Sequence, residues 1–435
     1  MFNFYAITKI QSVILICVIV VAAVGGTLAY VLLNGEVTSE TVKIGVFADL
    51  DDERGRSQWR GVMLAVEQLN DEGGIMGKQI EVVGEDNDVM SGADATVLNL
   101  ALTRLLSYHK VDFIIGIAGD KGFMVQDMVA EHKTIYFEFG SNEDEYTQRV
   151  LEDYDKYKYF FRPMFNATSV FHGATDSLVH LREMTDFNKV GYLGEDLGWT
   201  KGIMDGLDYV LPEVYGFDVV YRGKFPLDTV DFSSYFAAAE AAGVEVLLPF
   251  IGGLNGIPFV KEYHDRQSPM VIFGGFLNSL AAGPKGWVNT DGKCEYVSNV
   301  LWPTEAGYPL TIKTLPARDA YMDRWGEIPD WGSTATYDIM RYILPDAIER
   351  AGTLDVDMVI PALETTSIET TSARDFVFTS SHDLMMADPN NPDDDHSLVL
   401  LFQWVDGKQV PVYPKKIMEV EGGTYTFPDW SGPWD

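Results

Sequence analysis

Two neighbouring segments decide the fold, VKIGVFADL at residues 42–50 and GRSQWRGVMLAVEQLNDEGGIMGKQIEVVGEDND at residues 55–88. The first segment opens with a continuous apolar run that is rich in β-branched residues, which is typical of a buried strand. In the second segment, apolar residues recur with helical spacing at Val62, Ala65, Val66 and Leu69. Residues 80–85 then form another strand-like run. A strand, a helix and a strand in this order indicate a unit of a parallel sheet.

The same alternation continues along the chain and restarts near residue 159. Strands are expected at residues 42–48, 80–85, 111–117, 134–139, 159–162, 189–193, 218–225, 244–251 and 270–275. Helices are expected at residues 60–70, 92–107, 123–131, 170–184, 200–211, 232–242 and 255–266, where Asp231 is placed to cap the helix that follows it. Beyond residue 284 the order is looser, with strands at 296–302 and 398–405 and helices at 310–325 and 333–351. Two successive blocks of this kind predict an α/β chain with two doubly wound parallel-sheet lobes.

The N-terminus indicates export. Residues 10–33 carry no charge and are long enough to cross a bilayer, Lys9 precedes them, and Glu36 and Glu40 follow them. This asymmetry favours a single N-terminal membrane anchor with the bulk of the chain outside the cytoplasm. A cleaved signal, with Thr27-Leu28-Ala29 as its cleavage region, is the main alternative. Lipidation at Cys17 fits less well, because Cys17 lies in the middle of the apolar run.

Charge and motif content exclude several classes of function. The 435 residues carry a formal net charge of −33, and such a surface repels polyanions, so nucleic acid is a poor partner. The sequence contains no Walker A loop, no H-E-x-x-H, no C-x-x-C and no G-x-S-x-G motif. No two histidines have the spacing of a helical metal pair, and we expect no disulfide between Cys17 and Cys294. We therefore expect a binding protein without catalytic residues, cofactor or metal.

The order of these segments resembles the type I periplasmic binding proteins, specifically the leucine/isoleucine/valine-binding family of ABC importers. The resemblance spans roughly residues 42–405. It includes the Gly73-Gly74-Ile75 and Gly77 turn, where glycine permits a positive φ between helix and strand. It implies an anchor and spacer at residues 1–40 and a bilobal domain at 41–435, joined by a three-strand hinge. The first lobe would comprise about 41–160 plus 305–355, and the second about 161–304 plus 356–420.

The resemblance also implies a ligand site between the lobes, at loops that follow the carboxyl ends of strands. The positions that match are Trp59, Ala118, Gly119, Asp120, Gly140, Ser141, Asn142, Trp199, Gly252 and Phe276. For Trp59, packing on the start of its own helix is the alternative, and Asp120 could instead cap the helix after it. Glu138 ends a strand, and the sequence leaves open whether it faces the cleft or an ion pair.

Two departures bear on the ligand. Asp120 stands where the family often has a hydroxyl that holds the ligand carboxylate, and Phe276 stands where the family has a glutamate that pairs with the ligand ammonium. An anion at the first position repels an anionic ligand group. These departures predict an amino-acid-like, amide or cationic ligand that is not a standard α-amino acid, such as an amide, urea or polyamine-like compound, with tryptophan rings supplying stacking or cation–π contacts.

The predicted function is capture of a small polar ligand for an ABC-type importer, with the permease and ATPase subunits as partners and the membrane contacted through the N-terminal helix. A sensory ectodomain without a transport role is the alternative, since the same fold serves in receptors. An enzyme is the least favoured reading, because no catalytic motif occurs. The polar, aromatic end of the chain at residues 423–435 suggests no second membrane span, which favours capture.

Overall fold

A computed structural model describes residues 41–89, 92, 94–280, 284–421 and 424–430. Contacts between Cα atoms separate the segment Met1–Thr41 from one compact unit, Val42–Asp435. The predicted anchor at residues 10–33 lies outside the described residues. In the part of the chain that is described, no helix is both long and apolar enough to cross a membrane.

The first lobe is built on a five-stranded parallel sheet with the strand order β2-β1-β3-β4-β5. Its strands are β1 (Val42–Ala48), β2 (Ile80–Asp86), β3 (Phe113–Gly116), β4 (Ile135–Glu138) and β5 (Phe160–Phe161). Its helical segments are α2 (Glu53–Asp71), α3 (Ala95–Thr103), a π-helical turn at Arg104–His109, a 3₁₀ turn at Gly119–Lys121, α4 (Gly122–His132), α5 (Glu145–Glu152) and α6 (Tyr154–Tyr157). The predicted strands of this lobe are therefore confirmed, and the helix expected at 92–107 ends in a π-helical turn.

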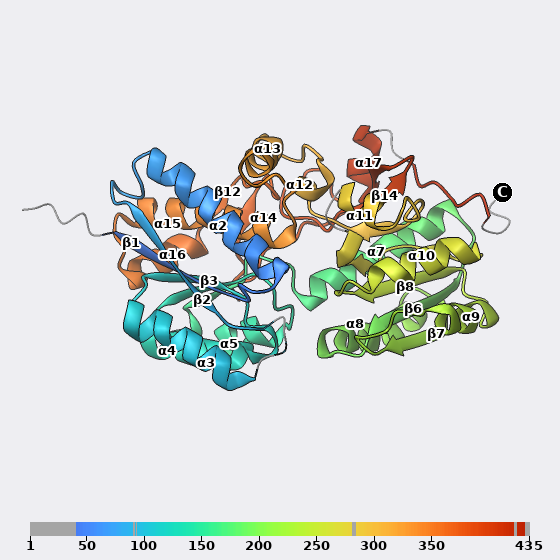
Figure 1. The fold of residues 1–435 in the computed structure, drawn as a ribbon, viewed down its shortest axis with the longest axis horizontal. Helices are drawn as coiled ribbons and strands as arrows, with labels where there is room; N and C mark the ends of the chain where they lie inside the picture. The colour runs from blue at the N-terminus through green and yellow to red at the C-terminus, as the bar shows by residue number, and fades with distance from the viewer. Residues whose placement is uncertain (1–40, 90–91, 93, 281–283, 422–423, 431–435) are drawn as a thin grey trace, which may run out of the picture. The chain divides into compact units, whose positions relative to one another are not determined.

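Helices lie on both faces of this sheet (Figure 1), and alternating side chains of its strands belong to different buried clusters. Ile44 and Val46 pack with Val62 of α2, whereas Phe47 packs with Leu98 and Val125 of α3 and α4. Helices on both faces are what a parallel sheet requires, and they explain why its strands read as continuous apolar runs.

The glycine turn between α2 and β2 has the predicted backbone. Gly73, Gly74 and Gly77 have φ values of 109°, 79° and 75°. A Cβ on Gly74 would overlap the carbonyl of Lys78. The helix therefore turns into β2 in a conformation that only glycine adopts without strain.

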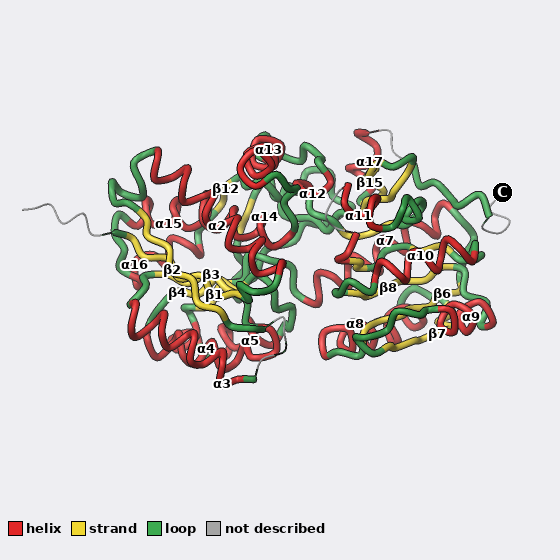
Figure 2. Tube along the Cα trace, viewed as in Figure 1, coloured by secondary structure: helices red, strands yellow, loops and turns green. Residues whose placement is uncertain are grey.

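The second lobe is built on another parallel sheet, with the strand order β10-β8-β6-β7 and β9 paired to β8. Its strands are β6 (Lys189–Glu195), β7 (Asp218–Phe225), β8 (Val246–Ile251), β9 (Val271–Ile272) and β10 (Phe276–Leu277). Its helical segments are α7 (Ala167–Met184), α8 (Gly198–Glu213), α9 (Ser233–Ala241), α10 (Gly256–Arg266), a 3₁₀ turn at Asn278–Leu280 and α11 (Pro284–Asn289). Phe232 occupies the N-cap of α9 and makes no side-chain capping bond, so Asp231 lies one residue before the capping position predicted for it, where it accepts from the backbone N–H and the hydroxyl of Ser233. Figure 2 shows strands and covering helices alternating in both lobes.

The rest of the chain contributes to both lobes. Its helical segments are α12 (Pro303–Ala306), α13 (Thr314–Trp325), α14 (Trp331–Asp338), a π-helical turn at Ile339–Ile343, α15 (Leu344–Ala351), α16 (Val356–Glu364) and α17 (Lys415–Glu421). Its strands are β11 (Ser298–Val300), β12 (Ser367–Ile368), β13 (Phe376–Val377), β14 (Leu401–Val405) and β15 (Lys408–Tyr413). Helix α14 packs on α2, and β11, β14 and β15 form an antiparallel sheet. The lobe boundaries stay predictions, and α16, which we placed in the second lobe, contacts α15.

Arg162 holds together segments that are far apart in the sequence, at the point where the chain passes from the first lobe to the second. Its side chain is fully buried, and its Nε donates to Asp383 Oδ1 at 2.7 Å. The guanidinium also donates to the carbonyls of Ser141 and Glu143 and to the hydroxyl of Thr147. A buried arginine with every neighbour accepting is a stable arrangement, because neither the charge nor its partners are left unpaired.

Candidate ligand-binding site

In the first lobe, a buried glutamate organises the loops that follow β3 and β4. Glu138, the last residue of β4, is fully buried. Its Oε2 accepts from the Ala118 N–H at 2.9 Å, and its Oε1 accepts from the N–H groups of Gly140 and Ser141 at 2.9 and 2.8 Å. Three predicted site residues are thereby gathered around one carboxylate. Burial raises the pKa of Glu138 to about 7, while the amide donors favour the charged form and limit the rise.

Gly119 and Asp120 form the outer part of the loop after β3. Gly119 has a φ of 54°, and its carbonyl accepts from the Tyr146 hydroxyl at 3.0 Å. The side chain of Asp120 is 76% exposed and forms an ion pair with Lys121. Helix α4 begins at Gly122 with no capping hydrogen bond from a side chain, so Asp120 does not cap it. The structure therefore leaves Asp120 in solvent, away from the buried carboxylate.

A second glutamate has the same role in the second lobe. Glu195, the last residue of β6, is 1% exposed, and its carboxylate accepts from the N–H groups of Gly252 and Gly253 at 3.0 and 2.9 Å. Burial raises its pKa, the two amides oppose the rise, and the charge of Arg54 in the first lobe lowers it further. The guanidinium of Arg54 is itself paired with Asp52 at 2.8 Å.

Trp199 and Phe276 form an aromatic wall beside Glu195. Trp199 lies in the first turn of α8, and its ring meets that of Phe276 edge to face, with 5.9 Å between centroids. A Cβ added to Gly252 would lie 3.6 Å from the Trp199 ring. The three second-lobe residues that the sequence predicts are therefore neighbours.

Residues of both lobes line one small cavity. Asn142 of the first lobe and Phe276 of the second lie on it, together with Phe165, Trp302, Glu305 and Trp331, and it encloses about 30 Å³. The rings of Phe165 and Trp302 stack with 4.9 Å between centroids. Glu305 is buried and accepts from the N–H groups of Trp302 and Trp331 at 2.9 and 2.7 Å. Burial raises the pKa of Glu305 well above its ordinary value, and the nearby charge of Asp330 adds to this rise.

Trp59 does not lie among the residues that line the inter-lobe cavity. It lies in α2, and a Cβ on Gly84 of the edge strand β2 would lie 2.8 Å from its ring. The ring is thus packed against the backbone of β2 and is not among the residues that line the inter-lobe cavity. The ring therefore packs on β2 and not on the start of its own helix, and ligand contact by Trp59 stays a prediction.

Reasoning from the sequence missed the two glutamates Glu195 and Glu305 and left Glu138 undecided. A signal was available for two of them, because Glu138 and Glu195 each end an apolar strand at the edge where ligand loops meet. Glu305 lies in the short helix α12, after residues whose pattern predicts little, so no comparable signal pointed to it.

One group of acidic side chains among the described residues could hold a metal ion. Oxygens of Asp49, Asp86 and Asp88 lie within 4.8 Å of one another. Asp49 accepts from the Asp52 N–H, and Asp86 accepts from the N–H groups of Leu50 and Asp88. These bonds give the first two carboxylates a role in shaping the loops after β1 and β2.

Comparisons with known proteins agree with this geometry. The model of the family described as "Periplasmic binding protein" matches residues 41–388. "Leu/Ile/Val-binding protein homolog 7" of Brucella abortus (strain 2308) is 25% identical over 398 residues, which cover 85% of this chain and 89% of that protein. A putative branched-chain amino acid ABC transporter from Silicibacter pomeroyi has a similar structure, with a TM-score of 0.74, 18% identity, and coverage of 90% of this chain and 100% of that chain. The substrate-binding protein LivJ from Streptococcus pneumoniae, in complex with isoleucine, has a TM-score of 0.69 and 18% identity, covering 86% of this chain and 100% of that chain.

Two parallel-sheet lobes are the architecture expected of a solute-binding protein. The chain belongs to the periplasmic binding protein family. Membership in this family confirms the predicted resemblance and the prediction of a binding protein that is not an enzyme.

Proposed function

We propose that this protein captures a small solute between its two lobes and delivers it to the permease and ATPase subunits of an ABC-type importer. The observation that carries the proposal is the inter-lobe cavity, where Asn142 of one lobe and Phe276 of the other line the same space. A site shared between lobes is the usual place for a ligand in this architecture. The names of the similar proteins, which refer to leucine, isoleucine and valine binding and to ABC transporters, support transport over sensing.

The ligand of this site has an amine or amide group and lacks a free carboxylate. The backbone N–H groups that could hold a ligand carboxylate already donate to Glu138 in one lobe and to Glu195 in the other. A ligand carboxylate would therefore meet like charge instead of free donors. The charge of Arg54 lowers the pKa of Glu195, and Arg54 is itself paired with Asp52.

The aromatic residues of the site fit the same class of ligand. Trp199 and Phe276 stand beside Glu195, and Trp302 and Trp331 stand beside Glu305. Aromatic faces attract ammonium groups, and the attraction is stronger where water is excluded. The carboxylate of Glu195 and the rings together select a cationic or neutral polar head, and the rings also accept an apolar body.

Capture requires movement of the lobes. A space of about 30 Å³ holds a water molecule, whereas sites for small organic ligands measure roughly 300 Å³ or more. The described arrangement of the lobes therefore has no room for the solute, and the lobes must move to admit and enclose it.

Calorimetry with a matched pair of compounds tests the ligand class. Leucinamide keeps the ammonium and side chain of leucine and lacks its carboxylate, so we expect leucinamide to bind at least tenfold more tightly than leucine at neutral pH. Glu195→Gln removes the carboxylate beside Trp199 and Phe276. It should weaken leucinamide binding by about tenfold, because a hydrogen bond to a charged group contributes roughly 1.5–3 kcal/mol. Glu183→Gln, an exposed carboxylate on α7, is the control and should bind normally.

Two results would count against the proposal. Micromolar binding of leucine would overturn the ligand class and leave the capture function standing. Absence of binding across amino acids, amides, polyamines and small carboxylates would overturn capture itself.

We also propose that residues 10–33 anchor the protein so that the bilobal body lies outside the cytoplasm. The uncharged run with Lys9 before it and acidic residues after it supports this orientation. The full chain should stay with membranes after alkaline washing, and a chain starting at Thr41 should be released. Recovery of both in the soluble fraction would contradict the anchor.

A further inference from the structure

A second and larger cavity lies beside α7, separate from the inter-lobe site. It measures about 380 Å³ and is bounded by α7 on one side and by the segment from Thr379 to Val399 on the other, with Tyr413 of β15 at one end. None of its lining residues lines the inter-lobe cavity. Its volume falls within the range of sites that hold small organic molecules.

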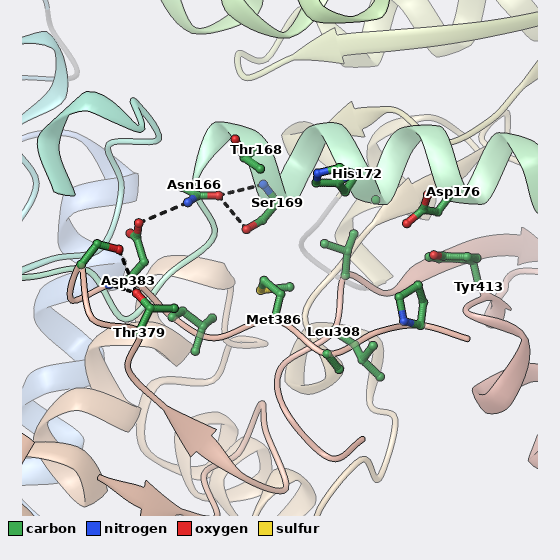
Figure 3. A pocket seen from close by; sticks show the side chains of 16 residues that line it. Asn166, Thr168, Ser169, His172, Asp176, Thr379, Asp383, Met386, Leu398 and Tyr413 are labelled. Atoms are coloured by element: carbon green, nitrogen blue, oxygen red, sulfur yellow. Dashed lines mark hydrogen bonds between the residues drawn. The ribbon is translucent and has the colours of Figure 1, made fainter. Parts of the chain in front are cut away.

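The cavity has one polar wall and one apolar wall. Ser169, His172 and Asp176 follow one another along the same face of α7 with helical spacing. The opposite wall is apolar and consists of Leu384, Met386, Ala387, Leu398 and Val399. Figure 3 shows Met386 and Leu398 between the two ends of the cavity, with Asp176 and Tyr413 at one end and Asn166, Thr379 and Asp383 at the other.

The two carboxylates that line the cavity differ in the charged partners that they have. Asp383 is engaged, because its oxygens accept from Arg162, Thr147 and Asn166. Among the described residues that line the cavity there is no lysine or arginine to pair with Asp176. Burial raises the pKa of Asp176, and Asp388 adds to the rise, while His172 and a hydrogen bond from Tyr215 oppose it.

Close packing holds this cavity in place. A Cβ on Gly173 of α7 would lie 2.7 Å from Val399, so the glycine lets the opposite wall approach the helix. At the other end, Asn166 accepts from the backbone N–H and hydroxyl of Ser169 at 2.7 Å and donates to Asp383 at 3.3 Å. The walls are therefore fixed to one another on both sides of the space.

We propose that this cavity is a second small-molecule site, which takes a small organic ammonium ion with a branched apolar body. The ammonium group lies at Asp176, and the apolar body lies on Met386, Leu398 and Val399. A cation at Asp176 gains an ionic partner, and the apolar wall gains contact area without burying an unpaired polar group.

Three compounds of one shape test this site: 3-methylbutylammonium, 3-methylbutanol and 3-methylbutanoate. Binding to the full chain is measured by calorimetry and by ligand-observed NMR. We expect the ammonium compound to bind at least tenfold more tightly than the alcohol, and the carboxylate to bind least, since a charge-assisted hydrogen bond contributes roughly 1.5–3 kcal/mol. Asp176→Asn combined with Glu195→Gln should remove this preference, and Glu183→Gln on the same helix should leave it unchanged.

The inter-lobe site also favours cations, so a second variant separates the two sites. In Glu195→Gln, which alters only the inter-lobe site, binding of the ammonium compound at α7 should persist. Loss of binding in Glu195→Gln with retention in Asp176→Asn would overturn this inference and support the inter-lobe proposal. Equal affinity for the ammonium compound and the alcohol would also overturn it, and thermal melts of both variants verify that they are folded.

Discussion

At the scale of single residues, the candidate site is defined by glutamates whose carboxylates accept hydrogen bonds from the backbone. Glu138, Glu195 and Glu305 each accept two or three main-chain N–H groups at the positions where loops leave their strands or helices. A buried N–H without an acceptor costs about 1–3 kcal/mol, so these carboxylates stabilise loops that would otherwise need a ligand or water to satisfy them. The loops are thereby ordered before any solute arrives.

Substitution of Glu138 by glutamine should change how stability depends on pH. The pKa of Glu138 is raised to about 7 in the folded protein, above its ordinary value of 4.5, so its stabilising contribution is fully present below about pH 4.5 and is lost as the pH rises through 7. Glutamine does not titrate. Between pH 5 and 8 the free energy of unfolding of Glu138→Gln should therefore fall less than that of the wild type, by up to roughly 3 kcal/mol.

Urea unfolding at several pH values measures this difference. Glu145→Gln, at an exposed position on α5, is the control and should give a curve parallel to that of the wild type. A parallel curve for Glu138→Gln as well would show that burial does not raise the pKa of Glu138.

The loops of the candidate site were predictable at this scale, because strand ends are readable from sequence. The strand before Gly140 and the strand before Gly252 are apolar runs, so the loops after them could be placed. Side-chain direction was not predictable, because it depends on packing between segments far apart in the chain. Trp59 turns to Gly84 of β2, and Asp120 turns to solvent, for reasons that only the folded neighbours supply.

At the scale of secondary-structure elements, the contact between α2 and α14 joins the first lobe to a much later part of the chain. Thr336 of α14 donates to the carbonyl of Gln58 at 2.9 Å. This hydrogen bond requires the helices to approach closely at Gly61, where a Cβ would overlap the Ser333 carbonyl and the Thr336 hydroxyl. A glycine within an otherwise regular helix is thus explained by its neighbour.

A pair of glycine-to-alanine changes should therefore have opposite effects. Gly61→Ala should lower the free energy of unfolding by about 1–3 kcal/mol, because the methyl group forces the helices apart. Gly202→Ala, in α8, should raise it by roughly 0.5–1 kcal/mol, because a Cβ there meets nothing within 4 Å and alanine restricts the unfolded chain. Chemical denaturation of both variants measures the difference, and destabilisation by Gly202→Ala would contradict the explanation.

The prediction of strands succeeded where the residues of the strand itself carry the apolar pattern, and it failed where the strand depends on its backbone conformation or on its partner strand. Strand β7 was expected at the residues where it lies, Asp218–Phe225, because its apolar run is bounded by turns. The strand expected at 270–275 is reduced to β9 at Val271–Ile272, because the backbone leaves the strand conformation at Gly274 with a φ of 67°, and β10 follows beyond the expected range. Strand β15 was missed, because its pairing with β14 is made across a turn at Asp406 and Gly407 and its own sequence mixes charged and apolar residues.

At the scale of the whole chain, solute capture depends on segments that return to both lobes. The chain enters the second lobe after Arg162, comes back with α14 on α2, and adds β14 and β15 beside β11. Because the passage is fixed by the buried contacts of Arg162, movement of the lobes has to occur around these contacts. A solute that touches both lobes would then favour the closed arrangement in proportion to its greater affinity for it.

Small-angle scattering should detect this shift. The tightest ligand of the calorimetric panel should lower the radius of gyration of the wild type, since closure brings the lobes together around the cavity lined by Asn142 and Phe276. Glu195→Gln at the same ligand concentration should change less, because its weaker binding leaves a smaller fraction closed, and raising the ligand concentration about tenfold should restore the change. A ligand that binds tightly by calorimetry and leaves the scattering profile unaltered would mean that the lobes do not close on it, and capture by hinge movement would have to be given up.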